Sequence, residues 1–66
     1  MKNNLKNMRI FRGYLQREFA NMINMPLSTY QQKEHGKIKI KIHELREMAK
    51  VLNCSIDKIL YGEDKK

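Results

Sequence analysis

Residues 16–37 of this chain read QREFANMINMPLSTYQQKEHGK, and this stretch decides the fold. Apolar side chains recur at helical spacing in its first half, which predicts a helix over about residues 16–23. Asn24 tolerates a left-handed backbone, and the residue before Pro26 is biased away from helix, so the first helix must end here. A second helix is expected beyond the break, over about residues 27–35. Two short helices joined by a tight turn are typical of a helix-turn-helix.

Helical patterns on both sides of this stretch predict an all-α fold of five helices. The other three helices are expected over about residues 4–12, 42–53 and 56–61, and the second of these carries the most regular apolar stripe in the chain. Residues 63–66 are expected to form a loose tail. Lys and Ile alternate over residues 37–42, a pattern typical of a strand. A strand there would find no partner within the chain, so a loop is the preferred interpretation.

Size and charge narrow the class of protein. The 66 residues suffice for one domain, spanning residues 1–66, but leave little structure for a walled catalytic cavity, which argues against an enzyme. Fourteen Lys and Arg against seven Asp and Glu give a net charge of +7, which indicates a nucleic acid or another anionic partner. Cys54 is the only cysteine, so no intrachain disulfide can form and a cytoplasmic location is expected. No apolar run approaches the roughly 20 residues of a membrane span, and the N-terminus does not resemble a signal peptide.

Several short motifs share a specific joint spacing. They are Gln16-x-x-x-Ala20, Asn24-Met25-Pro26, Ser28-Thr29-Tyr30 and Glu34-His35-Gly36-Lys37, with Leu5-x-x-Met8-Arg9-x-x-x-Gly13 upstream and the run from Met48 to Gly62 downstream. Together they resemble the Cro/XRE family of phage-repressor-like regulators, over about residues 4–62 and without insertions. The resemblance implies a lambda-repressor-like fold and sequence-specific binding of double-stranded DNA by a transcriptional regulator, expected to be a repressor that needs no cofactor.

Some residues depart from the family pattern. Lys33 stands where the family has an apolar residue and His35 where it has Asn, and both are expected on the DNA side. Leu15, Pro26 and Lys41 stand where Ser-type residues usually cap the helices. Because such caps contribute ~1 kcal/mol each, lower stability than in most relatives is expected.

The outward face of the helix over residues 27–35 is expected to contact DNA. Its groups are amide, hydroxyl and imidazole, without an acid, and such groups suit base edges in the major groove. Lys37 and Lys39 follow this helix and suit the phosphate backbone, as do Gln16 and Arg17 at the start of the preceding helix. The residues expected to bind DNA are Gln16, Arg17, Leu27, Ser28, Thr29, Gln31, Gln32, His35, Lys37 and Lys39.

Two charged residues on inward helix positions need a partner of opposite charge. Arg9 and Glu34 each lie on the inward side of an expected helix, where a lone charge is costly. The family resemblance implies that they form an interhelical ion pair.

A homodimer is expected, because a single helix reads too few base pairs to find one site in a genome. Apolar residues crowd the last helix, which is too short to bury them all. The residues expected at the dimer interface are therefore Ile56, Ile59, Leu60 and Tyr61.

Two other functional classes stay open. One is a DNA-binding antitoxin or other interaction module of a two-protein system, for which Ile10 and Phe11 could form a partner-binding patch. The other is a ribbon-helix-helix protein with an intermolecular strand, which is disfavoured because residues 55–61 are too short for its second helix. No metal site is expected, because His35 and His43 have no ligand spacing and only one cysteine beside them.

Overall fold

The computed structural model describes residues 3–63 and builds them from five α-helices, with no strand among these residues. The helices are α1 (Leu5–Phe11), α2 (Gln16–Met22), α3 (Leu27–Glu34), α4 (Ile42–Leu52) and α5 (Ile56–Tyr61). Each begins and ends within one residue of the expected range, so the prediction of an all-α fold with five helices is confirmed. The alternating Lys–Ile run forms a loop that leads into α4. Residues 64–66, most of the expected tail, lie outside the described residues.

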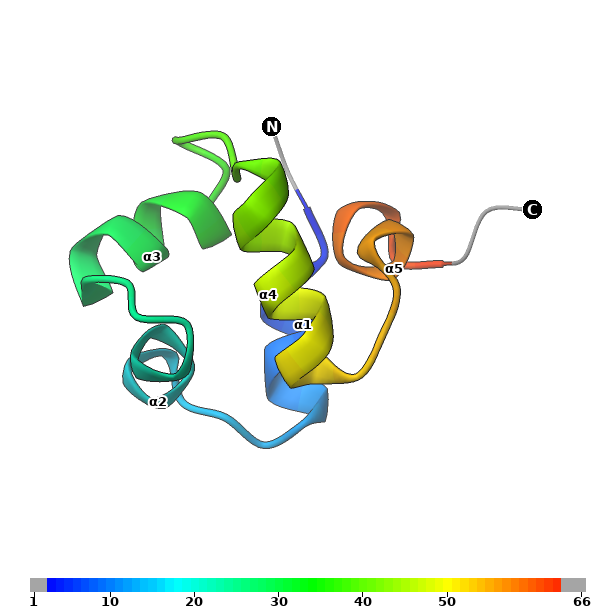
Figure 1. Cartoon of the computed structure of the whole chain (residues 1–66), viewed down its shortest axis with the longest axis horizontal. Coiled ribbons are helices and arrows are strands. Elements are labelled where there is room, and N and C mark those ends of the chain that lie inside the picture. The colour runs from blue at the N-terminus through cyan, green and yellow to red at the C-terminus, as the bar shows by residue number, and fades with distance from the viewer. Residues whose placement is uncertain (1–2, 64–66) are drawn as a thin grey trace.

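Helices α2 and α3 pack against each other at one end of the molecule, and α5 lies at the other end (Figure 1). Helices α1 and α4 lie between them, and both contact α5. None of the helices in residues 3–63 is long and apolar enough to cross a membrane.

Every helix contributes side chains to one apolar core. The Phe19 and Tyr30 rings meet edge to face, with centroids 5.4 Å apart, which joins α2 to α3. The buried apolar residues are Leu5, Met8, Phe19, Ala20, Tyr30, Leu45, Met48, Leu52 and Ile59. Ile42 lies at helical spacing from the buried Leu45 but is 57% exposed, because the first turn of α4 extends beyond the core.

The turn between α2 and α3 forms as the sequence predicts. Asn24 has a φ of 53°, in the left-handed region. The N–H of Met25 donates to the Ala20 carbonyl and that of Asn24 to the Asn21 carbonyl, so two carbonyls at the end of α2 find partners. Pro26 follows as the N-cap residue of α3, which fixes the tight connection between the two helices.

The helix starts are better capped than the sequence indicates. Leu15 and Lys41 offer no capping side chain, but the Glu18 and Glu44 carboxylates each accept the N–H of the residue three positions earlier, at 2.8 Å. These bonds are the second half of a capping box. The expectation of weak caps therefore holds only for Pro26, which has no side-chain bond.

One residue assigned to the dimer interface is placed elsewhere. Ile59 is fully buried in the core of its own chain, so its assignment to a dimer contact is wrong. The reason is that α1 covers α5 from the inside, and the Asn4 N–H donates to the Ile59 carbonyl at 2.6 Å. Tyr61, by contrast, is 51% exposed, and Ile56 and Leu60 are partly buried.

Candidate nucleic-acid interface

The outward side of α3 carries exposed polar groups on a rigid helix. Ser28, Gln32 and His35 are exposed and lie within about 60° of one another at ~100° per residue. Tyr30 on the opposite side is buried against α2. We call Ser28, Gln31, Gln32 and His35 the polar face of α3.

The polar face adjoins the start of α2. Gln16, Lys37 and the four residues of the polar face together line a shallow, open depression of about 390 Å³. The fold therefore brings six of the ten residues expected to bind DNA to one place. Arg17 and Lys39 are exposed as well, and Leu27 is partly exposed at the start of α3.

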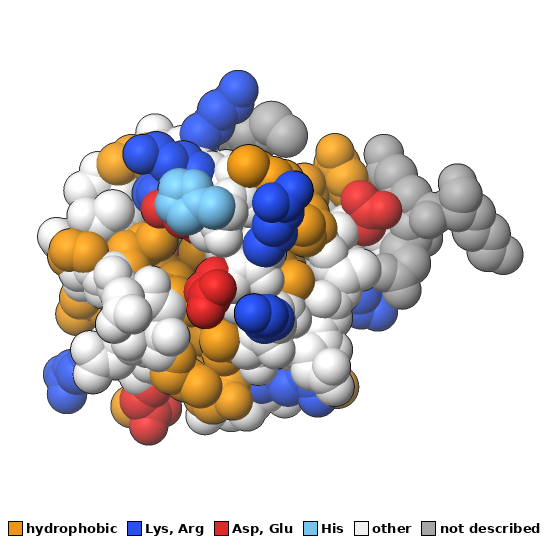
Figure 2. All heavy atoms as spheres, in the orientation of Figure 1, with side chains coloured by type: hydrophobic (Ala, Val, Ile, Leu, Met, Phe, Trp, Pro, Cys, Tyr) orange, Lys and Arg blue, Asp and Glu red, His pale blue; other side chains and the backbone are white. Residues whose placement is uncertain are grey.

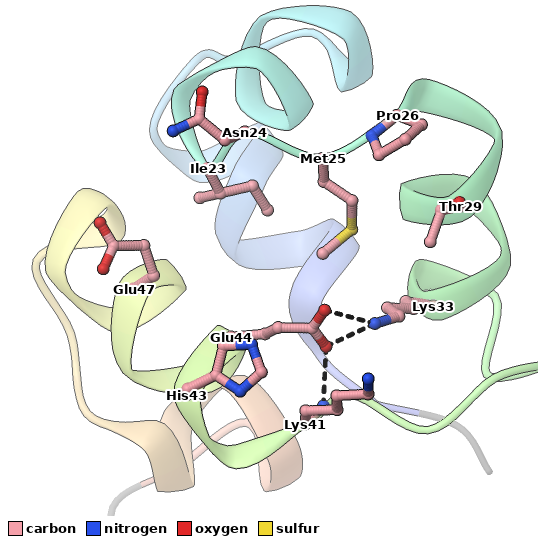
Figure 3. A pocket seen from close by; sticks show the side chains of 10 residues that line it. All are labelled: Ile23, Asn24, Met25, Pro26, Thr29, Lys33, Lys41, His43, Glu44 and Glu47. Carbon is pink, nitrogen blue, oxygen red and sulfur yellow. Dashed lines mark hydrogen bonds and ion pairs between the residues drawn. The ribbon is translucent and has the colours of Figure 1, made fainter.

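Thr29 is separated from the polar face. Its side chain lies on the flank of α3 that faces α4, where it lines a second hollow together with Lys33, Met25 and Glu44 (Figure 3). Seen from the front, this hollow has apolar side chains inside it and charged groups at its rim (Figure 2).

Lys33 was expected on the DNA side, and this expectation is wrong. Lys33 is only 4% exposed, and its ammonium group donates to both carboxylate oxygens of Glu44 at the start of α4 (Figure 3). Its place on the helix is about 60° from the buried Tyr30, so it occupies an inward position, where the family resemblance implies an apolar residue. That angle, with an acid in the first turn of α4, is the signal by which the pair could have been found.

The Lys33–Glu44 pair stabilises both charges away from water. Burial alone would raise the pKa of Glu44, but the hydrogen bonds from Lys33 and from the Lys41 N–H hold it below its ordinary value. Glu44 therefore has two structural roles, because it caps α4 and fastens α4 to α3.

The structure brings Arg9 and Glu34 together in a buried two-point contact. Arg9 Nε donates to Glu34 Oε2 at 2.9 Å and Arg9 Nη2 donates to Glu34 Oε1 at 3.2 Å. The side chains are 8% and 0% exposed, respectively. The third nitrogen of Arg9 donates to the Tyr14 carbonyl at 2.7 Å, so the guanidinium joins α1, the loop before α2, and the end of α3.

The Glu34 carboxylate accepts two further hydrogen bonds that the sequence did not reveal. The Tyr30 hydroxyl donates to Oε2, and Gln16 Nε2 donates to Oε1 at 3.0 Å. Burial alone would raise the pKa of Glu34, but the bonds from Arg9, Tyr30 and Gln16 hold it below its ordinary value. Burial and the bond to Glu34 raise the pKa of Tyr30, so its hydroxyl remains a donor.

Gln16 is engaged inside the protein at both ends of its amide. While Nε2 donates to Glu34, Oε1 accepts from Gln31 Nε2 at 3.1 Å. The sequence assigned Gln16 to a phosphate contact from its place at the start of α2, and nothing in the sequence linked it to Glu34, 18 positions away.

Two other features considered from the sequence are a partner-binding patch and a metal site. Ile10 and Phe11 are both exposed, Phe11 at 73%, and the Arg12 guanidinium lies over the Phe11 ring at 5.3 Å. Residues 3–63 contain no group of three or more His, Cys, Asp and Glu side chains that could hold a metal ion.

Comparisons with known proteins agree with this geometry. Residues 5–59 match a family model described as helix-turn-helix, of the Cro/C1 type. No curated protein matches the chain. Among solved structures, the chain is similar to a transcriptional regulator from Listeria innocua, with a TM-score of 0.78 and 21% sequence identity. The similarity covers 100% of this chain and 64% of that one, so the chain spans just under two thirds of that regulator's length.

Proposed function

We propose a function for this chain, which belongs to the Cro/C1-type helix-turn-helix family of DNA-binding transcription regulators. It acts in the cytoplasm as a repressor and binds an inverted-repeat operator as a dimer. The observation that carries the proposal is the polar face of α3. It presents hydrogen-bond donors and acceptors, most of them exposed, on a helix that two ion pairs hold in place. An α-helix fits the major groove, where each base pair has its own pattern of donors and acceptors.

Base reading is assigned to side chains along the outward side of α3. Gln32 is exposed, and its amide can bond adenine through two hydrogen bonds. Ser28 and His35 can donate or accept, and Leu27 can contact a thymine methyl group. Gln31 completes the set from the flank of α3 that faces α2.

Phosphate contacts are assigned to exposed basic residues on both sides of α3. Arg17 lies on α2, and Lys37 and Lys39 lie on the loop after α3. Such contacts set the register of the protein on DNA and make binding depend on salt. Repression requires no more than occupancy of the operator, because a bound protein excludes other proteins from the same DNA.

Dimerisation is assigned to the end of the molecule that carries α5. Tyr61 is 51% exposed, and a nearby hollow of about 310 Å³ has a mostly apolar lining that includes Leu60 and three isoleucines, Ile38, Ile40 and Ile42. An exposed apolar surface of this kind is typical of an interface. Two copies related by a two-fold axis would read half-sites about 34 Å apart.

The experiment is selection of bound sequences from random duplex DNA, followed by titration of the selected duplex and sedimentation of the free protein. An inverted repeat with half-sites one helical turn apart, saturated at two chains per duplex, is the expected result. Saturation at one chain per duplex without cooperativity would rule out the dimer. Recovery of no motif would rule out sequence-specific binding.

A further inference from the structure

A chain of hydrogen bonds leads from the buried Arg9–Glu34 pair to the polar face of α3. Glu34 Oε1 accepts from Gln16, and Gln16 accepts in turn from Gln31. Glu34 has a fully buried side chain, Gln16 and Gln31 are partly buried, and both glutamines line the depression of the polar face. This series of hydrogen bonds therefore connects the interior to the surface through two side-chain amide groups.

The direction of these bonds is fixed by the chemistry of the first acceptor. An ionised carboxylate only accepts hydrogen bonds, and Glu34 is held ionised by the Arg9 guanidinium, which only donates. The side-chain amide of Gln16 must therefore turn its NH₂ group toward Glu34 and its oxygen, Oε1, toward Gln31. The side-chain amide of Gln31 must in turn present its NH₂ group to Gln16. The amide oxygen of Gln31, Oε1, therefore points away from Gln16.

The side-chain amide oxygen of Gln31, Oε1, has no hydrogen-bond partner among residues 3–63. It is an acceptor of fixed orientation at the edge of the depression lined by Ser28, Gln32 and His35. The exposed amide of Gln32 behaves differently, because it makes no side-chain hydrogen bond in the described part of the chain and can turn either way.

We propose that Gln16 and Glu34 are positioning residues that fix the polarity of Gln31, so that Gln31 selects a base with an exocyclic amine, adenine or cytosine, on the strand it faces. In the major groove adenine N6 and cytosine N4 are donors, whereas guanine O6 and thymine O4 are acceptors. This inference rests on the proposed function, since it names the base class that one residue of the same site reads. An unrestrained glutamine would turn its amide over and accept all four bases more evenly.

The test compares three single variants, Gln16→Met, Gln31→Met and Gln32→Met, and the double variant Gln16→Met/Gln31→Met. Methionine keeps the length of the side chain and removes its donor and acceptor. The sequence preference of each variant is measured at every base pair of the selected duplex. The Gln32→Met variant is the matched control, because Gln32 lies on the same face and has no side-chain hydrogen bond to Gln16 in the described residues.

The wild-type protein is expected to prefer adenine or cytosine at one base pair of each half-site by about fivefold, the size expected of one hydrogen bond. Gln31→Met and Gln16→Met should each reduce this preference to less than twofold at that base pair. The double variant should lose no more of this base preference than Gln31→Met alone, because both changes break the same series of hydrogen bonds. Gln32→Met should leave this base pair unaffected and relax another.

Three outcomes would overturn the inference. On the strand that faces Gln31, the wild-type protein could prefer guanine or thymine at the base pair that Gln31→Met relaxes. Gln16→Met could weaken all duplexes alike and keep the preference, which would make Gln16 a phosphate contact only. The effects of Gln16→Met and Gln31→Met at that base pair could also be fully additive, as for independent contacts.

A measurement without DNA separates this inference from the proposed function. In the free protein, Gln16→Met should shift the NMR signals of the Gln31 side-chain amide toward those of an exposed glutamine, for which Gln32 is the reference. Unchanged Gln31 signals would overturn the proposed positioning of Gln31 by Gln16 even if the protein binds DNA. Shifted signals would support it even if no duplex is selected.

Discussion

Replacing Arg9 by methionine is expected to lower the free energy of unfolding by about 3 kcal/mol at neutral pH. Glu34 would lose the two bonds from Arg9 and keep those from Tyr30 and Gln16. Its side chain is 0% exposed, so water cannot replace the lost donors. Removing one partner of a buried pair costs ~3–5 kcal/mol, and the two remaining donors place this case at the lower end.

The assay is equilibrium unfolding in urea, with Arg9→Met/Glu34→Gln as the control. The double variant removes the buried charge together with its partner, so it should recover at least ~1 kcal/mol of the loss. A domain of this size has only ~3–10 kcal/mol of stability, so the single variant is expected to unfold at much lower urea than the wild type.

The pH dependence supplies a second check. In the wild type the pKa of Glu34 is depressed, so the stabilising contribution is present above the unfolded-state pKa of about 4.3 and is lost as the pH falls through the folded value. In Arg9→Met, burial is expected to raise the pKa of Glu34, so the penalty is complete at neutral pH and is relieved toward pH 4. The two stabilities should therefore converge between pH 7 and pH 4. A loss below ~0.5 kcal/mol at pH 7, or a difference that does not change with pH, would refute the reasoning.

Three other expectations concern DNA binding and the second ion pair. Gln32→Ala should cost ~1–3 kcal/mol on the selected operator and relax choice at one base pair, and an equal loss on random DNA in a binding titration would contradict the assignment. Lys37→Ala should weaken binding to all duplexes alike and lower the slope of log K against log salt by about one, whereas an unchanged slope would exclude a phosphate contact. Glu44→Ala should destabilise the fold in urea by about 3 kcal/mol, because it leaves Lys33 buried and unpaired, whereas Glu18→Ala removes only an exposed cap and should cost ~1 kcal/mol. Equal losses in the two glutamate variants would mean that the Lys33 pair contributes nothing.

The helices could be predicted from the sequence because apolar spacing and chain-breaking residues are local properties. Asn24 and Pro26 end α2 and begin α3 wherever the rest of the chain lies. The outward residues of α3 followed from the same local rule, since the positions opposite Tyr30 on a helix must face away from the core.

The errors concern residues whose environment is set by distant parts of the chain. Lys33 is a residue type that favours the surface, and only the approach of α4 explains why it is buried beside Glu44. Ile59 is covered by α1, more than 40 positions away in the chain, so the crowding of α5 alone could not show which side chain faces outward. The assignment of Gln16 to DNA stays a prediction, but its bonds to Glu34 and Gln31 could not be predicted, because tertiary packing brings these partners to it.

The two buried ion pairs of α3 come from adjacent residues, Lys33 and Glu34, at the last turn of the helix. Ser28, Gln32 and His35, by contrast, form no side-chain hydrogen bonds with the rest of residues 3–63. The side chains that hold the helix and those proposed to contact DNA are therefore different side chains on the same helix. Mutations at these three surface positions are expected to be nearly neutral for folding, so the proposed base preference can be changed by single substitutions without loss of the fold.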